Sequence, residues 1–186
     1  MNFLNRISPV PKKAEYLNEP SILIGTQGAA NCCIKALFTE ECALGASACR
    51  KLMDRFTSLL NAAVAPCADV EIRLELADAP QDMVNAEQGY EILAQDNTII
   101  LRGFGEAGLY YAVTTFLQIL HMDAGRVYFP ACHIVDSPDL KTRGHFMETR
   151  YGSNLMELDD WKAVVDHMEE MKQNQLTVSV YGCWCD

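Results

Sequence analysis

The chain has 186 residues, and its 15 Lys and Arg residues against 25 Asp and Glu residues give a formal net charge of −10. This length suffices for one domain and part of another, whereas a complete eight-stranded β/α barrel needs about 250 residues. The acidic balance argues against nucleic acid or an anionic membrane as a partner, because both require clustered positive charge. Hydrophobic residues make up 49% of the sequence, which is typical of a globular core.

In the first part of the chain, the pattern of apolar residues predicts both strands and helices. Residues 21–25 form a short apolar run that predicts a strand, and apolar residues at intervals of three and four predict a helix over 41–65. Residues 69–76 alternate strictly between apolar and polar, which is typical of a half-buried strand. The other elements expected here are a hairpin over 89–103, a second amphipathic helix over 106–121 and a strand over 126–135 that contains Pro130.

After residues 136–139 the order of elements changes to strand, helix and strand. The expected elements are a strand over 144–149, a helix over 159–173 and a strand over 176–180, with Trp161, Val164, Val165, Met168 and Met171 on the apolar side of the helix. Strand, helix, strand within about 40 residues predicts a parallel βαβ unit. Because one βαβ unit cannot bury both faces of its strands, we expect this sequence to be the front part of a longer protein.

The cysteines and the N-terminus limit the cofactors and the cell compartment. The eight cysteines and four histidines show no spacing typical of a metal site, so we expect no metal ion and no cofactor. The N-terminal residues lack the apolar run of a signal peptide, and no stretch reaches 18 apolar residues, so we expect no membrane partner. Together with cysteines expected to be reduced, these features favour the cytoplasm.

Gly103-Phe104-Gly105-Glu106-Ala107-Gly108 matches the G-x-G-x-x-G pattern of dinucleotide sites. Two features favour a tight strand-to-helix turn instead. The preceding strand is the second arm of a hairpin, and Asp136 lies 28 residues beyond Gly108, where a ribose-binding acid is expected about 20 residues on. A nucleotide-binding module that uses this turn is kept as an alternative.

A series of short motifs resembles β-N-acetylhexosaminidases of glycoside hydrolase family 20. Residues 108–120 resemble the "G-aromatic-A-x-x-T-L-x-Q-L" helix in the small α+β domain that precedes the catalytic barrel of this family. The other similar stretches, in order, are Pro9-Val10-Pro11, Gly89-Tyr90-Glu91-Ile92, Ile134-Val135-Asp136-Ser137-Pro138, Arg143-Gly144, and the Met168, Met171, Lys172, Asn174 and Leu176 positions of "M-A-x-x-K-x-N-x-L".

The resemblance implies both a fold and an activity. It implies an α+β fold, with a small mixed sheet and two helices on one face, in residues 1–138, followed by the first βαβ unit of a truncated β/α barrel in residues 139–186. It also implies that the longer protein hydrolyses terminal N-acetylhexosaminides by substrate-assisted catalysis. Family members carry their two catalytic carboxylates after the fourth barrel strand, so we expect no catalytic residue in this chain. A non-catalytic carbohydrate-active accessory domain is a further alternative.

Candidate sugar-binding residues follow the two strands of the βαβ unit, where barrel enzymes hold their substrates. Arg150 is the match to a family arginine that holds sugar hydroxyls, although Glu148-Thr149-Arg150 is one residue shorter than the family pattern. The alternative for Arg150 is a surface or ion-paired arginine. Glu148 is a candidate polar ligand or an ion-pair partner of Arg143 or Arg150. Trp184 is a candidate for stacking on a pyranose ring, or a residue with no role at the chain terminus.

Two further expectations concern the substrate and self-association. Residues 148–152 are also similar to the "E-G-F-Y-G" stretch of glycoside hydrolase family 84, the O-GlcNAcase-like enzymes, which leaves the choice of sugar substrate open. The unpaired strand edges and apolar faces of a truncated barrel predict self-association of the chain.

Overall fold

The computed structural model describes residues 3–39, 41–148 and 155–179 and divides the chain into two compact units, Met1–Asp139 and Leu140–Asp186. The described part of the first unit contains two sheets and two long helices, and that of the second contains a pair of strands and a helix. Among the described residues, no helix combines the length and the apolar character needed to cross a membrane.

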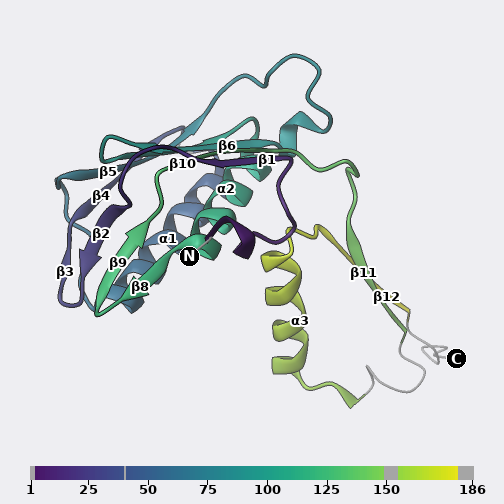
Figure 1. Cartoon of the computed structure of the whole chain (residues 1–186). Coiled ribbons are helices and arrows are strands. Elements are labelled where there is room, and N and C mark those ends of the chain that lie inside the picture. Colours follow the sequence, from purple (N-terminus) through teal and green to yellow (C-terminus); the bar gives the residue numbers. More distant parts are fainter. Residues whose placement is uncertain (1–2, 40, 149–154, 180–186) are drawn as a thin grey trace, which may run out of the picture. The chain divides into compact units, whose positions relative to one another are not determined.

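The larger sheet of Met1–Asp139 has six strands and is mixed (Figure 1). These strands are β1 (Lys13–Tyr16), β4 (Cys32–Leu37), β5 (Val70–Leu76), β6 (Tyr90–Gln95), β7 (Thr98–Gly103) and β10 (Cys132–Asp136). Their order is β1-β10-β6-β7-β5-β4, in which β4, β5 and β7 run parallel and the remaining neighbours antiparallel. The predicted hairpin is β6 and β7, whereas β4 was not among the predicted strands.

The smaller sheet is antiparallel and has the order β3-β2-β9-β8. Its strands are β2 (Ile22–Thr26), β3 (Ala29–Ala30), β8 (His121–Asp123) and β9 (Arg126–Phe129). The prediction of one strand over 126–135 is wrong, because the chain leaves the smaller sheet after β9 and enters the larger sheet as β10. Pro130 stands at this change of sheet, where its missing N–H breaks the ladder.

Two helices, α1 (Ala43–Leu60) and α2 (Glu106–Ile119), lie side by side against one face of the larger sheet (Figure 1). This arrangement confirms the predicted α+β fold with a small mixed sheet and two helices on one face. Helix α1 ends five residues before the predicted end because Asn61 adopts a left-handed conformation with φ 51° and donates its N–H to Thr57 O at 2.9 Å. Two short 3-10 helices complete the unit, η1 (Phe3–Arg6) and η2 (Ala86–Gln88).

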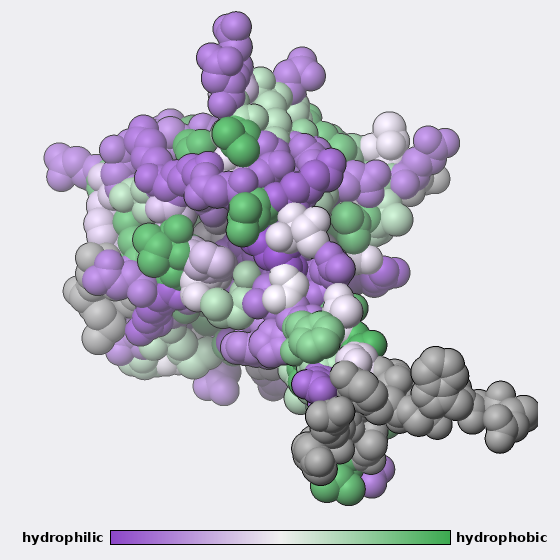
Figure 2. Space-filling model, turned by 90° about the vertical axis from the view of Figure 1, so that its right-hand side faces the viewer, coloured by the Kyte–Doolittle hydropathy of each residue, from purple (hydrophilic) through white to green (hydrophobic). Residues whose placement is uncertain are grey.

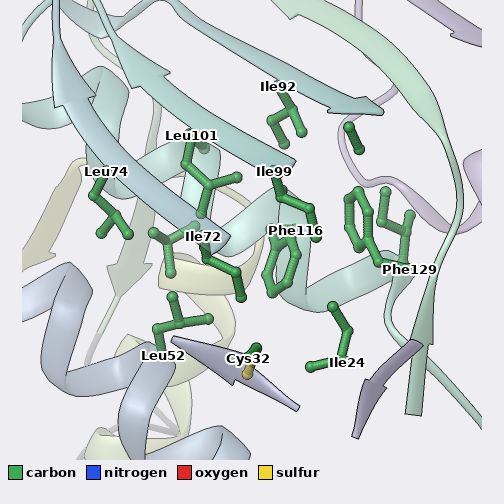
Figure 3. Close-up of a cluster of buried hydrophobic side chains, with 14 of the residues drawn as sticks. Ile24, Cys32, Leu52, Ile72, Leu74, Ile92, Ile99, Leu101, Phe116 and Phe129 are labelled. Carbon is green, nitrogen blue, oxygen red and sulfur yellow. The ribbon is translucent and has the colours of Figure 1, made fainter. Parts of the chain in front are cut away.

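Phe116 of α2 lies at the centre of the hydrophobic core. Its ring centroid is 6.0 Å from that of Phe56 on α1 and 4.4 Å from that of Phe129 on β9, so it joins both helices to the smaller sheet. Figure 3 shows Phe116 beside the aliphatic side chains of the larger sheet, among them Ile72 and Ile99. On the surface shown in Figure 2, hydrophilic residues predominate and hydrophobic ones form small separate groups.

The cysteines of the described residues are unpaired, and several belong to the core. Cys32 and Cys132 are fully buried, and burial raises the pKa of both thiols to about 12. They are therefore protonated at neutral pH and pack as small apolar residues. Within the residues that the structure describes, no group of three or more His, Cys, Asp or Glu side chains is placed to hold a metal ion.

The unit Leu140–Asp186 is built from β11 (Gly144–Glu148), α3 (Leu158–Glu170) and β12 (Gln175–Ser179). β11 and β12 pair in parallel, with Gly144 opposite Gln175, as the order of strand, helix and strand predicts. Helix α3 buries Met168, but Val165, which was predicted on the apolar side, is 52% exposed.

Candidate functional site

Of the three predicted sugar-binding residues, Glu148 lies among the described residues, whereas Arg150 and Trp184 lie outside them. Glu148 is exposed, ends β11 and lies opposite Ser179 of β12. Because both strands run in the same direction, these two residues mark the carboxyl edge of the pair, which is the edge that carries substrate sites in β/α barrels. The structure thus places Glu148 in β11, and the roles of all three residues stay predictions.

The opposite edge of this strand pair is fastened by Arg143 and Asn174. The Arg143 guanidinium donates to Lys172 O from Nε at 3.1 Å and from Nη2 at 2.8 Å, and the Arg143 N–H donates to Asn174 Oδ1 at 2.9 Å. Gly144 permits the close pairing that follows, because a Cβ at this position would lie 2.4 Å from Gln175 O. These are residues of the two family-like motifs in this unit, and they fix the path of the backbone.

A second cluster joins the family-like motifs of Met1–Asp139. The buried hydroxyl of Tyr90 accepts a hydrogen bond from Thr115 Oγ1 at 2.7 Å and donates one to Asp136 Oδ2 at 3.3 Å. Asp136 Oδ1 accepts from the N–H of Lys12 at 3.2 Å, and Lys12 Nζ donates to Ser137 Oγ at 3.1 Å. Burial and the Asp136 charge both raise the pKa of Tyr90, which keeps its hydroxyl neutral as a donor. The cluster fixes the end of β10.

The glycine-rich turn over residues 103–108 is packed against backbone from η2 and the start of β6. A Cβ on Gly108 would lie 1.9 Å from Gly89 O, and a Cβ on Gly105 would lie 2.5 Å from Glu87 O. A phosphate at a helix N-terminus needs backbone N–H groups facing an open space, but here two carbonyl oxygens lie against the glycines. The glycines therefore serve close packing, and the geometry speaks against the nucleotide-binding alternative.

Comparison with known families identifies the larger unit. A sequence profile described as glycosyl hydrolase family 20, domain 2, matches residues 5–137. A search of curated protein sequences found no match.

Several solved structures share the fold. An exo β-N-acetylglucosaminidase from Vibrio harveyi, in complex with N-acetylglucosamine, has a TM-score of 0.70 at 19% identity, covering 94% of this chain and 25% of that one. A chitobiase from Flavobacterium johnsoniae has a TM-score of 0.69 at 17% identity, covering 96% and 27%. A β-N-acetylhexosaminidase from Streptomyces coelicolor A3(2) has a TM-score of 0.66 at 22% identity, covering 94% and 34%.

This chain spans between a quarter and about a third of the length of these structures. The similarity to these solved structures shows a shared fold, whereas the family profile matches most of the sequence of this chain. The chain therefore belongs to glycosyl hydrolase family 20, with its domain 2 in residues 5–137.

Proposed function

We propose that this chain is the N-terminal region of a glycoside hydrolase that releases terminal N-acetylhexosamine residues. In this proposal Met1–Asp139 is the accessory domain and Leu140–Asp186 is the first βαβ unit of the catalytic β/α barrel. The observation that carries the proposal is the order of the two parts: a family 20 domain over residues 5–137, then a parallel strand pair joined through a helix. That pair with its helix is the repeating unit of a β/α barrel.

The chemistry we propose for the longer protein is substrate-assisted hydrolysis. The oxygen of the substrate's 2-acetamido group attacks the anomeric carbon as the glycosidic C–O bond breaks, so the enzyme supplies no nucleophile. A water molecule then adds to the anomeric carbon and opens the ring that this attack formed, which completes the hydrolysis. One carboxylate orients the amide, and a second carboxyl group, held protonated, gives its proton to the leaving oxygen. We place this pair after the fourth strand of the barrel, on the C-terminal side of β12. The Vibrio harveyi relative, whose structure contains N-acetylglucosamine, supports this class of sugar.

The contribution of this chain to catalysis is to bind the sugar at the carboxyl edge of β11 and β12. Glu148 is exposed at that edge and is proposed to accept hydrogen bonds from sugar hydroxyls. We assign Arg150 as a bidentate donor to neighbouring hydroxyls and Trp184 as a stacking surface for a pyranose ring.

Hydrolysis of 4-nitrophenyl N-acetyl-β-D-glucosaminide tests this proposal. A longer protein that carries this region is expected to release nitrophenol, whereas the 186-residue chain alone is expected to release none. In the longer protein, Arg150→Met should raise KM about tenfold or more, because it removes a charged hydrogen-bond donor. Arg50→Met, which removes an exposed arginine from α1, is the control. A longer protein that holds a carboxylate pair and is inactive on both gluco- and galacto-configured substrates would refute the proposal.

We also propose that the chain alone self-associates through Leu140–Asp186. Phe146 of β11 is 66% exposed, and Leu158 and Val165 of α3 are 69% and 52% exposed. Light scattering should show oligomers of the chain, and the double variant Phe146→Ser, Val165→Ser should be monomeric. Val84→Ser, which changes a residue 54% exposed in Met1–Asp139, is the matched control and should leave the oligomers unchanged. A monomeric wild-type chain at high concentration would contradict this expectation.

A further inference from the structure

The face of the larger sheet that lies opposite α1 and α2 is polar, and its side chains are held in place across the strands. In β5, Val70, Ile72 and Leu74 are buried, so the alternation of the strand places Glu71 and Glu75 on the other face. Carboxylates on this face meet cations from neighbouring strands. The face is thus a surface of fixed polar groups.

Arg102 of β7 lies between two glutamates on the strands at either side. It is in register with Glu75 of β5 and with Glu91 of β6. Its Nε donates to Glu75 Oε1 at 2.7 Å, and its Nη1 donates to Glu91 Oε2. Glu91 Oε1 is in turn 2.7 Å from His133 Nε2 on β10. The three side chains of the Glu75–Arg102–Glu91 triad are only 20–29% exposed, so they are held in position before any ligand arrives.

An open surface pocket of about 390 Å³, called the cavity below, lies beside this triad. Its walls are the triad itself, Phe104, Val135 and the loop of residues 77–80 that follows β5. Phe104 is half-buried, and Asp78 in the loop is exposed. The cavity therefore combines carboxylate acceptors, a guanidinium donor and an aromatic ring, all within Met1–Asp139.

We propose that this cavity is a second carbohydrate-binding site, which takes a neutral mono- or disaccharide. Vicinal hydroxyls need acceptors and donors side by side, and Glu75 with Arg102 provides both at a fixed spacing. Phe104 offers an apolar wall against which the C–H face of a sugar ring packs. The volume lies within the range of about 300–1,000 Å³ that small-molecule sites occupy.

Other ligand classes fit this lining less well. An anion such as phosphate meets the three carboxylates of Glu75, Asp78 and Glu91 against the single guanidinium of Arg102. An inorganic cation competes with that guanidinium, which already lies between Glu75 and Glu91. A neutral polyhydroxyl ligand uses the acceptors and the donor together and does not disturb the charge balance.

The site goes beyond the proposed hydrolase function, because it needs no catalytic carboxylate and lies on the accessory domain. Its role would be to hold glycan on the accessory domain. Sugar binding is measured on the 186-residue chain, so a failure of hydrolysis in the longer protein would not count against this site. Equally, a failure of sugar binding at this site would not count against the proposed hydrolase function.

The test is an NMR titration of the ¹⁵N-labelled chain with N-acetylglucosamine and N,N′-diacetylchitobiose. We expect saturable shifts of the amides of Ala77, Asp78, Ala79 and Phe104, with Kd values of about 1–10 mM, the range of weak binding at about −3 to −4 kcal/mol. Glucosamine, which carries an ammonium group, is titrated in parallel. Absence of saturable shifts, or binding of glucosamine without binding of either neutral sugar, would overturn the proposal.

Glu75→Gln and Glu71→Gln form a matched pair of variants. Both residues lie on β5, on the same face and in ion pairs, but Glu71 pairs with Lys35 and Arg73 outside the cavity. Glu75→Gln should weaken sugar binding about tenfold, whereas Glu71→Gln should bind as the wild type does. Phe104→Leu keeps an apolar side chain but removes the aromatic ring, so it should also weaken sugar binding. This variant tests the proposed site if Glu75→Gln fails to fold. Equal affinities of Phe104→Leu and the wild type would overturn the assignment.

Discussion

The two units of the chain are held together in different ways. Among the described residues, the buried hydrophobic side chains lie in Met1–Asp139 with the exception of Met168. In Leu140–Asp186, by contrast, Phe146 and Leu158 are 66% and 69% exposed, and the strands are fastened by hydrogen bonds of Arg143 and Asn174. The first unit is thus stabilised chiefly by burial of apolar surface, and the second by strand pairing and by hydrogen bonds from polar side chains. Mutations should therefore act on one unit without the other.

The strongest test of this comparison is Phe116→Ala. Phe116 is fully buried between Phe56 and Phe129, so its truncation leaves a cavity that the packed rings cannot fill. We expect a loss of about 3–5 kcal/mol in the free energy of unfolding of Met1–Asp139, measured by urea unfolding. Phe146→Ala removes an equal volume from an exposed site, and at a protein concentration low enough to keep the chain monomeric it should change stability by less than about 0.5 kcal/mol. Similar losses in both variants would show that the two units do not differ in this way.

Arg143→Met should act on the second unit alone. Methionine retains the unbranched apolar part of the arginine side chain but lacks the guanidinium that donates to Lys172 O. Hydrogen bonds from a charged donor contribute about 1.5–3 kcal/mol, so exchange of the amides of β11 and β12 should accelerate correspondingly. Amides of β6 and β7 should exchange as in the wild type. Lys162→Met, at an exposed cation of α3, is the control. Unchanged exchange in β11 and β12 would mean that Arg143 is dispensable for this strand pair.

Gly108→Ala separates packing from nucleotide binding at the glycine-rich turn. Its Cβ would overlap a backbone oxygen, Gly89 O at 1.9 Å, which cannot move without shifting β6. Despite a gain in helix propensity of about 1 kcal/mol, we expect a net loss of about 1–3 kcal/mol in thermal unfolding. Gly45→Ala on α1 is the milder comparison, because its nearest neighbours are the side chains of Cys42 and Phe38. A Gly108→Ala variant as stable as the wild type would contradict the packing role.

The elements that the sequence predicts well are those whose pattern is local. The apolar residues of α1 and α2 recur at helical spacing, and β5 alternates along its own length. β4 was missed because its residues change from buried to exposed along the strand, without alternation. The change of sheet at Pro130 was missed because a run of β-formers does not reveal which neighbours each half will pair with.

For the site, the sequence predicts the family but not the chemistry. The motifs that carry the resemblance contain Tyr90, Asp136, Arg143 and Asn174, and these residues fix the backbone. They therefore identify the domain and say little about a substrate. Glu148 lies in β11, a strand that the local pattern over residues 144–149 predicts. The cavity beside Arg102 was not predicted, because its walls come from separate strands whose neighbourhood is set by the sheet register.

The smallest expected effect is a change in the acid sensitivity of Met1–Asp139. Hydrogen bonds from Lys35 and then Arg73 lower the pKa of Glu71 below its ordinary value of 4.5. A carboxyl whose pKa is lower in the folded state stabilises the protein above the ordinary value, and this contribution is lost as the pH falls through the folded-state pKa. Glu71→Gln removes the titrating group, so its unfolding free energy should fall less steeply below pH 4.5 than that of the wild type. Arg55→Met removes an exposed cation of α1, which lies against the opposite face of the sheet from Glu71, and should keep the wild-type slope. Parallel acid profiles of Glu71→Gln and the wild type would show that the ion pairs of Glu71 with Lys35 and Arg73 do not contribute to the stability of Met1–Asp139.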